Sequence, residues 1–245
     1  MKFAPVIYLI GMLLCILSLF MLVPAIVDWF YGSNDWPAFI ASSLVTVFFG
    51  GAFYFSGRGS ATEHLELRQA FLLTNSAWLS IALFGSLPFL FSEINMSFVD
   101  AIFESTSGIT TTGSTVIVNL EQTSHGILIW RALLQWLGGV GIIVMALAVL
   151  PMLSIGGMQL FKTESYETPD KVVPKAAGFA KGISIVYITL TIAWAVMLWG
   201  AGMPVFDSIA HAMTTIATGG YSTKSSSLAA FNSSSIELII IFGMI

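Results

Sequence analysis

The sequence predicts an all-α integral membrane protein. Two leading transmembrane helices precede repeated units of helix, short pore helix, filter segment and helix, and the last helix is truncated. Three observations predict this fold: the composition, the spacing of long apolar runs, and two similar Thr/Gly-rich segments too short to cross a bilayer. Of 245 residues, 56% are hydrophobic and 9% are charged, whereas soluble proteins carry about 25% charged residues. Too few polar side chains remain to cover a water-facing surface, which excludes an ordinary soluble domain.

Five apolar runs are long enough to span a bilayer, which takes about 20 residues. They cover residues 5–30, 36–56, 70–91, 126–153 and 183–201. A sixth run begins near Ile236 and stops at Ile245. At about 1.5 Å per residue it reaches only half the hydrocarbon thickness. We therefore expect a fragment of a longer chain or a shortened reading frame.

These runs divide the chain into four parts. Residues 1–69 carry two N-terminal transmembrane helices, and residues 70–156 form a first pore repeat. Residues 157–182 form a polar loop, and residues 183–245 form a second, incomplete pore repeat.

The charged residues predict the orientation. If the spans alternate, one side receives most of the basic residues: Lys2, Arg58, Arg68, Lys162, Lys171, Lys175 and Lys181. The positive-inside rule places this side, with the amino terminus and the 157–182 loop, in the cytoplasm. The acids lean to the outer side, where they either attract cations to a shared vestibule or simply cap helices and solvate loops. They are Asp28, Asp35, Glu93, Asp100, Glu104, Glu121, Asp207 and Glu237.

Several functional classes are excluded by missing motifs. Cys15 is the single cysteine, so no intrachain disulfide forms, and no metal-ligand spacing occurs. The sequence contains no Walker loop, dinucleotide fingerprint or catalytic triad. We expect no enzyme, no covalent cofactor and no nucleic-acid partner, and we expect membrane lipid around the chain.

Two stretches, 98–116 and 205–223, form an internal repeat. They align without gaps, and each lies between two predicted spans. Identical pairs include Asp100 with Asp207, Ile102 with Ile209, Ile109 with Ile216, and Gly113 with Gly220. Internal repeats define whole architectures, so this alignment makes the repeat the building unit of the fold.

The chemistry of the unit favours a cation. Asp100 and Asp207 are expected to start short pore helices by accepting a backbone N–H bond. Each helix then ends near mid-membrane, where the negative end of its dipole favours a cation. The chain returns as a first filter segment (110–113) and a second filter segment (217–220). Non-helical backbone at that depth must be buried or line water, and its carbonyl oxygens can replace the hydration shell of an ion.

A packing role is the alternative for Gly/Thr-rich runs, because small residues let helices approach closely. That interpretation suits Gly138, Gly139 and Gly141 within the fourth span. It suits the filter segments poorly, because no neighbouring span is long enough to include them.

Three motifs carry a family resemblance: SGITTTGST at 107–115, WRALLQWLGGVG at 130–141, and TIATGGYST at 215–223. Together they resemble bacterial Trk-type potassium uptake subunits, the TrkH group of the Trk/Ktr/HKT superfamily. The resemblance implies four repeats around one pore, as in potassium channels, in a bacterial inner-membrane protein. It also implies a homodimer and a cytosolic nucleotide-binding regulatory ring of the TrkA type. Glycine at the filter position accompanies potassium selectivity in that family, and here both positions, Gly113 and Gly220, are glycine.

The resemblance and the repeat together predict potassium uptake across the inner membrane through a channel-like pore. The expected filter residues are Thr110, Thr111, Thr112, Gly113, Ala217, Thr218, Gly219 and Gly220. The expected K⁺ ligands are the backbone carbonyls of Thr111, Thr112, Thr218 and Gly219. Two alternatives remain open: a non-conducting fragment or associating membrane subunit, and K⁺ symport coupled to H⁺ or Na⁺.

Two further polar residues have alternative interpretations. Arg131 starts a span on the outer side, where it either reaches the interface or pairs with a pore-helix acid such as Glu104. His211 aligns with Glu104 in the repeat and is either a proton sensor or a hydrogen-bonded packing residue.

Overall fold

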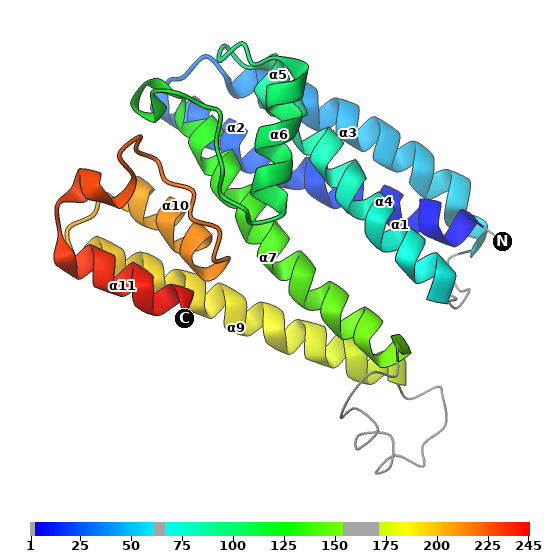
Figure 1. Ribbon diagram of the computed structural model, residues 1–245. Coiled ribbons are helices and arrows are strands. Elements are labelled where there is room, and N and C mark those ends of the chain that lie inside the picture. The colour runs from blue at the N-terminus through cyan, green and yellow to red at the C-terminus, as the bar shows by residue number, and fades with distance from the viewer. Residues whose placement is uncertain (1–2, 61–66, 154–171) are drawn as a thin grey trace.

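The computed structural model describes residues 3–60, 67–153 and 172–245. Within these ranges every regular element is a helix, as predicted (Figure 1). The α-helices are α1 (Ala4–Phe20), α2 (Leu22–Tyr31), α3 (Trp36–Gly57), α4 (Leu67–Gly85), α5 (Leu87–Phe91), α6 (Phe98–Ile109), α7 (His125–Leu153), α9 (Val172–Gly200), α10 (Val205–Ile216) and α11 (Ser234–Met244). Short 3₁₀ turns occur at Arg58–Ser60, Leu120–Gln122 and Ser227–Phe231.

The predicted spans are confirmed. Five helical segments of the described chain are long and apolar enough to cross a membrane: Ala4–Tyr31, Trp36–Gly57, Arg68–Phe91, His125–Ile143 and Gly182–Gly200. The short apolar helix α11 occupies the place of the predicted sixth run. The chain is therefore a multi-pass membrane protein.

The predicted loop at 157–182 does not extend to residue 182. Residues 172–182 form the beginning of α9, and the rest of the predicted loop lies outside the described residues. Pro174 falls in the first turn of this helix, where its missing N–H costs no hydrogen bond. The Ala pair that follows favours helix, so helical propensity prevails over the polar character of the segment.

The first span contains a break between α1 and α2 at Met21. Pro24 has no N–H to donate to the carbonyl four residues earlier, which interrupts the helix there. The helix ends at Gly32 in a left-handed conformation (φ 72°). The neighbouring span α3 packs closely on α1 because Gly11 lies against the backbone at Gly50, where a side chain would clash.

Helix α7 is the centre of the structure. It packs against α2, α4, α6, α9 and α10. Its fully buried side chains include Ile127, Trp130 and Leu134, which join Phe39 and Phe89 in the main apolar core. The indole N–H of Trp130 donates to the carbonyl of the last α4 residue at 3.0 Å. Both repeats are thus organised around one helix.

The short helices α6 and α10 confirm the predicted pore helices. Each has 12 residues, and the ungapped alignment of the repeat pairs their first residues and their last residues. They pack on α7 from either side (Figure 1). After each helix the chain continues without regular structure, so the two filter segments lie at the C-terminal ends of α6 and α10.

Candidate functional site

The pore helices begin differently from the prediction. Ser97 caps α6: its Oγ accepts from the Asp100 N–H at 3.2 Å and donates to the Asp100 carboxylate at 2.7 Å. Helix α10 follows Pro204, which provides no side-chain cap. The prediction that Asp100 and Asp207 cap by accepting a backbone N–H is wrong, because each helix starts two residues before its aspartate. Both aspartates still lie in the first turn, where a negative charge favours the helix dipole.

The backbone of the two filter segments has the same unusual shape. Thr110 and Ala217 end their helices with φ of −83° and −78°. The next residues, Thr111 and Thr218, are left-handed, with φ of 57° and 52°. A left-handed conformation costs a non-glycine residue about 1–2 kcal/mol. Such strain concentrates at functional sites when the surroundings enforce it.

A second left-handed residue follows two positions later in each segment. Gly113 and Gly220 have φ of 82° and 78°, which glycine adopts without steric cost. Alternation of right- and left-handed residues turns successive N–H groups to one side of the chain.

Hydrogen bonds show which side the N–H groups face. The amides of Thr111 and Thr112 donate back to the helix carbonyls of Gly108 and Ser107, both at 3.0 Å. The equivalent amides of the second repeat do the same at 2.9 and 2.8 Å. Among the described residues, none donates a hydrogen bond to the carbonyl oxygen of Thr111, Thr112 or Thr218. These oxygens are therefore available to a ligand.

Gln135 of α7 holds the second filter segment. Its amide nitrogen donates to the Gly219 carbonyl at 2.9 Å, and its amide oxygen accepts from the Tyr221 N–H at 3.1 Å. The side chain is fully buried. A Cβ on Gly219 would overlap this amide, so only glycine fits there. A helix of the first repeat thus fixes the filter of the second.

A buried ion pair lies one turn earlier on α7. The Nε of Arg131 is 2.7 Å from Glu104 Oε1, and both side chains are at most 1% exposed. The Glu104 carboxylate also accepts from the Thr115 hydroxyl at 2.9 Å and from the Val116 N–H at 3.0 Å. Arg131 Nη1 donates to the Ser222 carbonyl at 2.9 Å. The predicted pairing of Arg131 with Glu104 is confirmed.

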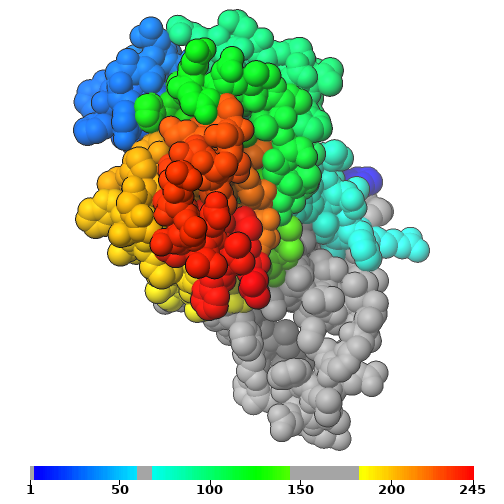
Figure 2. All heavy atoms as spheres, turned by 60° about the vertical axis from the view of Figure 1, so that its left-hand side comes forward, coloured from blue at the N-terminus to red at the C-terminus, as the bar shows by residue number. Residues whose placement is uncertain are grey.

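Tyr221 joins the two repeats directly. It follows the second filter segment, yet its hydroxyl lies 3.0 Å from the Glu104 carbonyl and 3.2 Å from the Ser114 carbonyl. The Arg131 guanidinium carbon lies 4.1 Å from the centre of the Tyr221 ring, within the range of a cation–π contact. The segments that follow the two filters meet on one face of the molecule, green and orange in Figure 2.

His211 is hydrogen-bonded at both ring nitrogens. Nδ1 is 2.8 Å from the Asp207 carbonyl, and Nε2 is 3.0 Å from the Ser222 hydroxyl. A carbonyl can only accept, so Nδ1 carries the proton, and in the neutral ring Nε2 accepts from Ser222. The Asp207 carboxylate accepts from the Thr223 hydroxyl at 2.6 Å. Both residues therefore support the chain that follows the second filter.

The acids of the outer side do not all face an open vestibule. Asp28, Asp35, Glu104 and Asp207 are buried. Asp28 accepts from the Gly126 N–H at the start of α7, and Asp35 accepts from the backbone N–H of Glu93. For these four buried acids the vestibule interpretation is wrong, and Asp28, which binds the start of α7, has the capping role that the alternative predicted.

Residue-type reasoning missed Gln135 and Tyr221. A signal was present, because Arg131 and Gln135 are four residues apart and so share a helix face. For Tyr221 the sequence offers no comparable signal, since its partners Glu104 and Ser114 are more than 100 residues away.

Several known proteins are similar to this chain in sequence. The TrkH family of cation transport proteins matches residues 36–245. The chain is 43% identical to the Trk system potassium uptake protein TrkH of Vibrio parahaemolyticus over 98% of its own length and 50% of that protein. It is 40% identical to the Escherichia coli protein of the same name, with the same coverage.

The fold matches as well. The crystal structure of the potassium transporter TrkH from Vibrio parahaemolyticus superposes with a TM-score of 0.89 at 41% identity, covering 99% of this chain and 49% of that one. The chain thus spans about half the length of the relatives it matches. The family is one of transport proteins, so the prediction of a non-enzymatic membrane protein is confirmed. This chain belongs to the TrkH family of cation transport proteins.

Proposed function

We propose that this chain supplies two of the filter segments of a potassium uptake pore. One observation carries the proposal: both filter segments combine a left-handed Thr and a left-handed Gly, and their Thr carbonyls have no donor among the described residues. Oxygens arranged in this way can replace the water shell of a cation. The relatives are potassium uptake proteins, so K⁺ is the proposed transported ion.

The proposed K⁺ ligands are the carbonyl oxygens of Thr111, Thr112 and Thr218. The Gly219 carbonyl oxygen makes a smaller contribution to K⁺ binding. The Gly219 oxygen already accepts a hydrogen bond from Gln135, so it offers an ion only its second lone pair. The other filter residues, Thr110, Gly113, Ala217 and Gly220, shape the turn.

The filter segments are open on one side. Thr110, Thr112, Thr218 and Gly220 are exposed, although their helices are well packed. Two further repeats, in a protein of the relatives' length, would face these residues and close a ring of four filters. In this arrangement α7 sets the distance between the first two filters through Arg131 and Gln135.

The proposed membrane, orientation and partners of the chain rest on its basic residues and its family. We place the chain in a bacterial inner membrane with its amino terminus in the cytoplasm, where most Lys and Arg residues then lie. A homodimer and a cytosolic nucleotide-binding ring of the TrkA type are the proposed partners. No titratable side chain lies in either filter segment, which favours a channel-like pore over symport.

The test is cation flux into liposomes. The chain is reconstituted by itself and as a fusion to the second half of the Vibrio parahaemolyticus relative, and radioactive rubidium uptake is followed against K⁺, Na⁺ and Li⁺ competition. Uptake by the fusion that K⁺ blocks and Na⁺ does not supports the proposal. Equal competition by K⁺ and Na⁺ would overturn it, and uptake that needs a proton or Na⁺ gradient would establish symport.

A further inference from the structure

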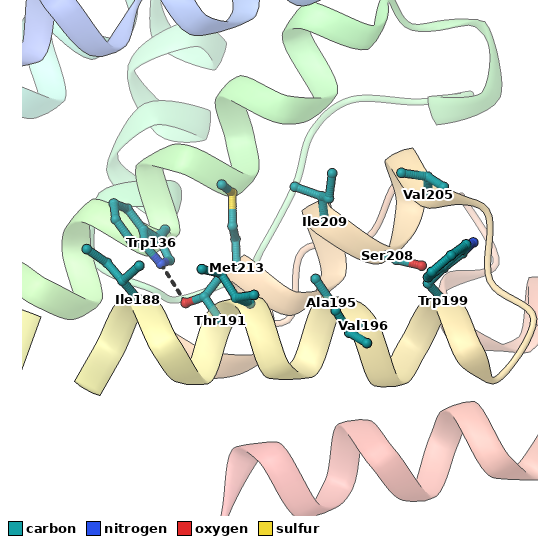
Figure 3. Close-up of a pocket in the computed structure, with 11 residues that line it drawn as sticks. Trp136, Ile188, Thr191, Ala195, Val196, Trp199, Val205, Ser208, Ile209 and Met213 are labelled. Carbon is teal, nitrogen blue, oxygen red and sulfur yellow. Dashed lines mark hydrogen bonds between the residues drawn. The ribbon is translucent and has the colours of Figure 1, made fainter. Parts of the chain in front are cut away.

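An apolar groove of about 510 Å³ lies where α7, α9 and α10 meet (Figure 3). Eleven residues line it, and all but Thr191 and Ser208 are apolar. The groove runs along α9 from Ile188 to Trp199, with α10 forming the opposite wall. It is separate from the filter segments, which contribute no lining residue.

The two hydroxyl groups in the walls are already hydrogen-bonded. Thr191 Oγ1 donates to the Tyr187 carbonyl at 2.8 Å and accepts from the Trp136 indole N–H at 3.0 Å. The Ser208 hydroxyl donates to the Pro204 carbonyl at 2.9 Å. An ordered water needs two to four polar partners. These walls therefore suit an apolar occupant.

The groove opens onto the exposed surface of the α9 span. Only 11% of the α9 span is buried in the described chain. Ile192 and Val196 of α9 and Ile209 of α10 line the groove and are also exposed. Trp199 marks one end of the span, the position at which tryptophan anchors a helix at the membrane interface. The groove is therefore continuous with the exposed apolar surface of a candidate membrane span.

Its length fits one leaflet. The α9 positions from Ile188 to Trp199 extend about 16 Å at 1.5 Å per residue. The hydrocarbon core is about 30 Å thick, so this is the depth that the chains of a single leaflet reach. Trp136 lies at one end of the groove and Trp199 at the other (Figure 3).

We propose that this groove is a binding site for one acyl chain of a phospholipid, whose headgroup lies at the Trp199 end and whose chain extends to Trp136. The chain would contact Ile209 and Met213, so it would pack behind the pore helix that carries the second filter segment. This site does not depend on the proposed permeation path, because lipid binding is measured without ion flux.

Two matched substitutions on α9 test the site. Ala195 lines the groove, whereas Ala193 is exposed on the same helix and outside the lining. The purified chain and its Ala195→Phe and Ala193→Phe variants are loaded with dioleoyl phosphatidylethanolamine, and retained lipid is counted by native mass spectrometry. Ala195→Phe should weaken retention about tenfold, the loss of contact with about two methylene groups. Ala193→Phe should retain lipid like the parent chain, and equal retention by both variants would overturn the proposal.

A second measurement needs no groove-filling variant. The emission of Trp136 is obtained as the difference between the parent chain and Trp136→Phe in bilayers. Phospholipid brominated along its acyl chain should quench that emission, because bromine quenches tryptophan on contact. If the Trp136 emission is not quenched, protein rather than lipid covers the groove, and the proposal fails.

Discussion

Glu104 and His211 hold equivalent places in the two repeats, and each binds the hydroxyl of the residue 11 positions later. Glu104 accepts from Thr115 at 2.9 Å, and His211 lies 3.0 Å from the Ser222 hydroxyl. Both side chains are buried behind a filter segment. The two repeats thus bind the chain after the filter segment with different side chains. The first repeat uses a carboxylate, Glu104, which Arg131 neutralises, and the second uses the imidazole of His211.

The ion pair leads to a stability prediction. Glu104→Gln leaves the buried Arg131 charge without a partner, so the unfolding free energy should fall by about 3–5 kcal/mol. Denaturant titration in mixed micelles measures the change. Glu237→Gln, on an exposed face of α11, is the matched control and should change stability by less than about 0.5 kcal/mol. A fall as small as that of the control would show that the pair contributes nothing.

Gln135 leads to a selectivity prediction. Gln135→Leu removes both hydrogen bonds to the second filter segment and leaves the Tyr221 N–H unsatisfied, which costs about 1–3 kcal/mol. In the full-length fusion, preference for K⁺ over Na⁺ should fall about tenfold, since about 1.4 kcal/mol is a factor of ten. Competition of rubidium uptake measures it. Gln122→Leu alters an exposed glutamine and should leave selectivity intact. Unchanged selectivity in Gln135→Leu would contradict the proposal that Gln135 holds the second filter segment in place.

Gly113 leads to a prediction about the filter itself. In Gly113→Ser the new Cβ would overlap the Gly219 carbonyl oxygen, and the residue would have to keep φ at 82°. The two filter segments should move apart, and discrimination against Na⁺ in the fusion should weaken about tenfold or more, as about 1–2 kcal/mol of strain implies. Gly141→Ser is the control, because among the described residues a Cβ there meets only Trp78, at 3.9 Å. If Gly113→Ser and Gly141→Ser transport alike, the filter assignment fails.

Glu121 leads to a pH prediction. Hydrogen bonds from the Ser225 hydroxyl at 2.6 Å and its N–H at 2.8 Å lower the pKa of Glu121 below the ordinary value of 4.5. The contact between the two chains that follow the filters is therefore fully present above pH 4.5 and is lost as the pH falls through the lowered pKa. Carboxyl NMR of the labelled protein should show a lowered midpoint that Ser225→Ala raises again. An identical midpoint in the parent and the variant would show that the Ser225 hydroxyl does not lower the pKa of Glu121.

Much of the fold was predictable because membrane spans depend on local composition. The five spans and the two pore helices all appear where apolar runs and the repeat placed them. The helix caps were predicted wrongly, since Ser97 rather than Asp100 occupies the capping position. A polar residue near a helix start is a weaker signal than a long apolar run, because neighbouring residues compete for the same N–H groups.

The sequence by itself determined the membrane class, the repeat and the positions of the two short helices α6 and α10, because hydrophobicity and the spacing of a repeat are properties of the chain alone. Only the tertiary structure decided what holds the filters. The contacts of Gln135 with Gly219, of Arg131 with Ser222, and of Tyr221 with Glu104 join residues 84, 91 and 117 positions apart. Such pairs exist only because α6 and α10 pack on one helix, α7, and no local pattern encodes which distant groups that packing brings together.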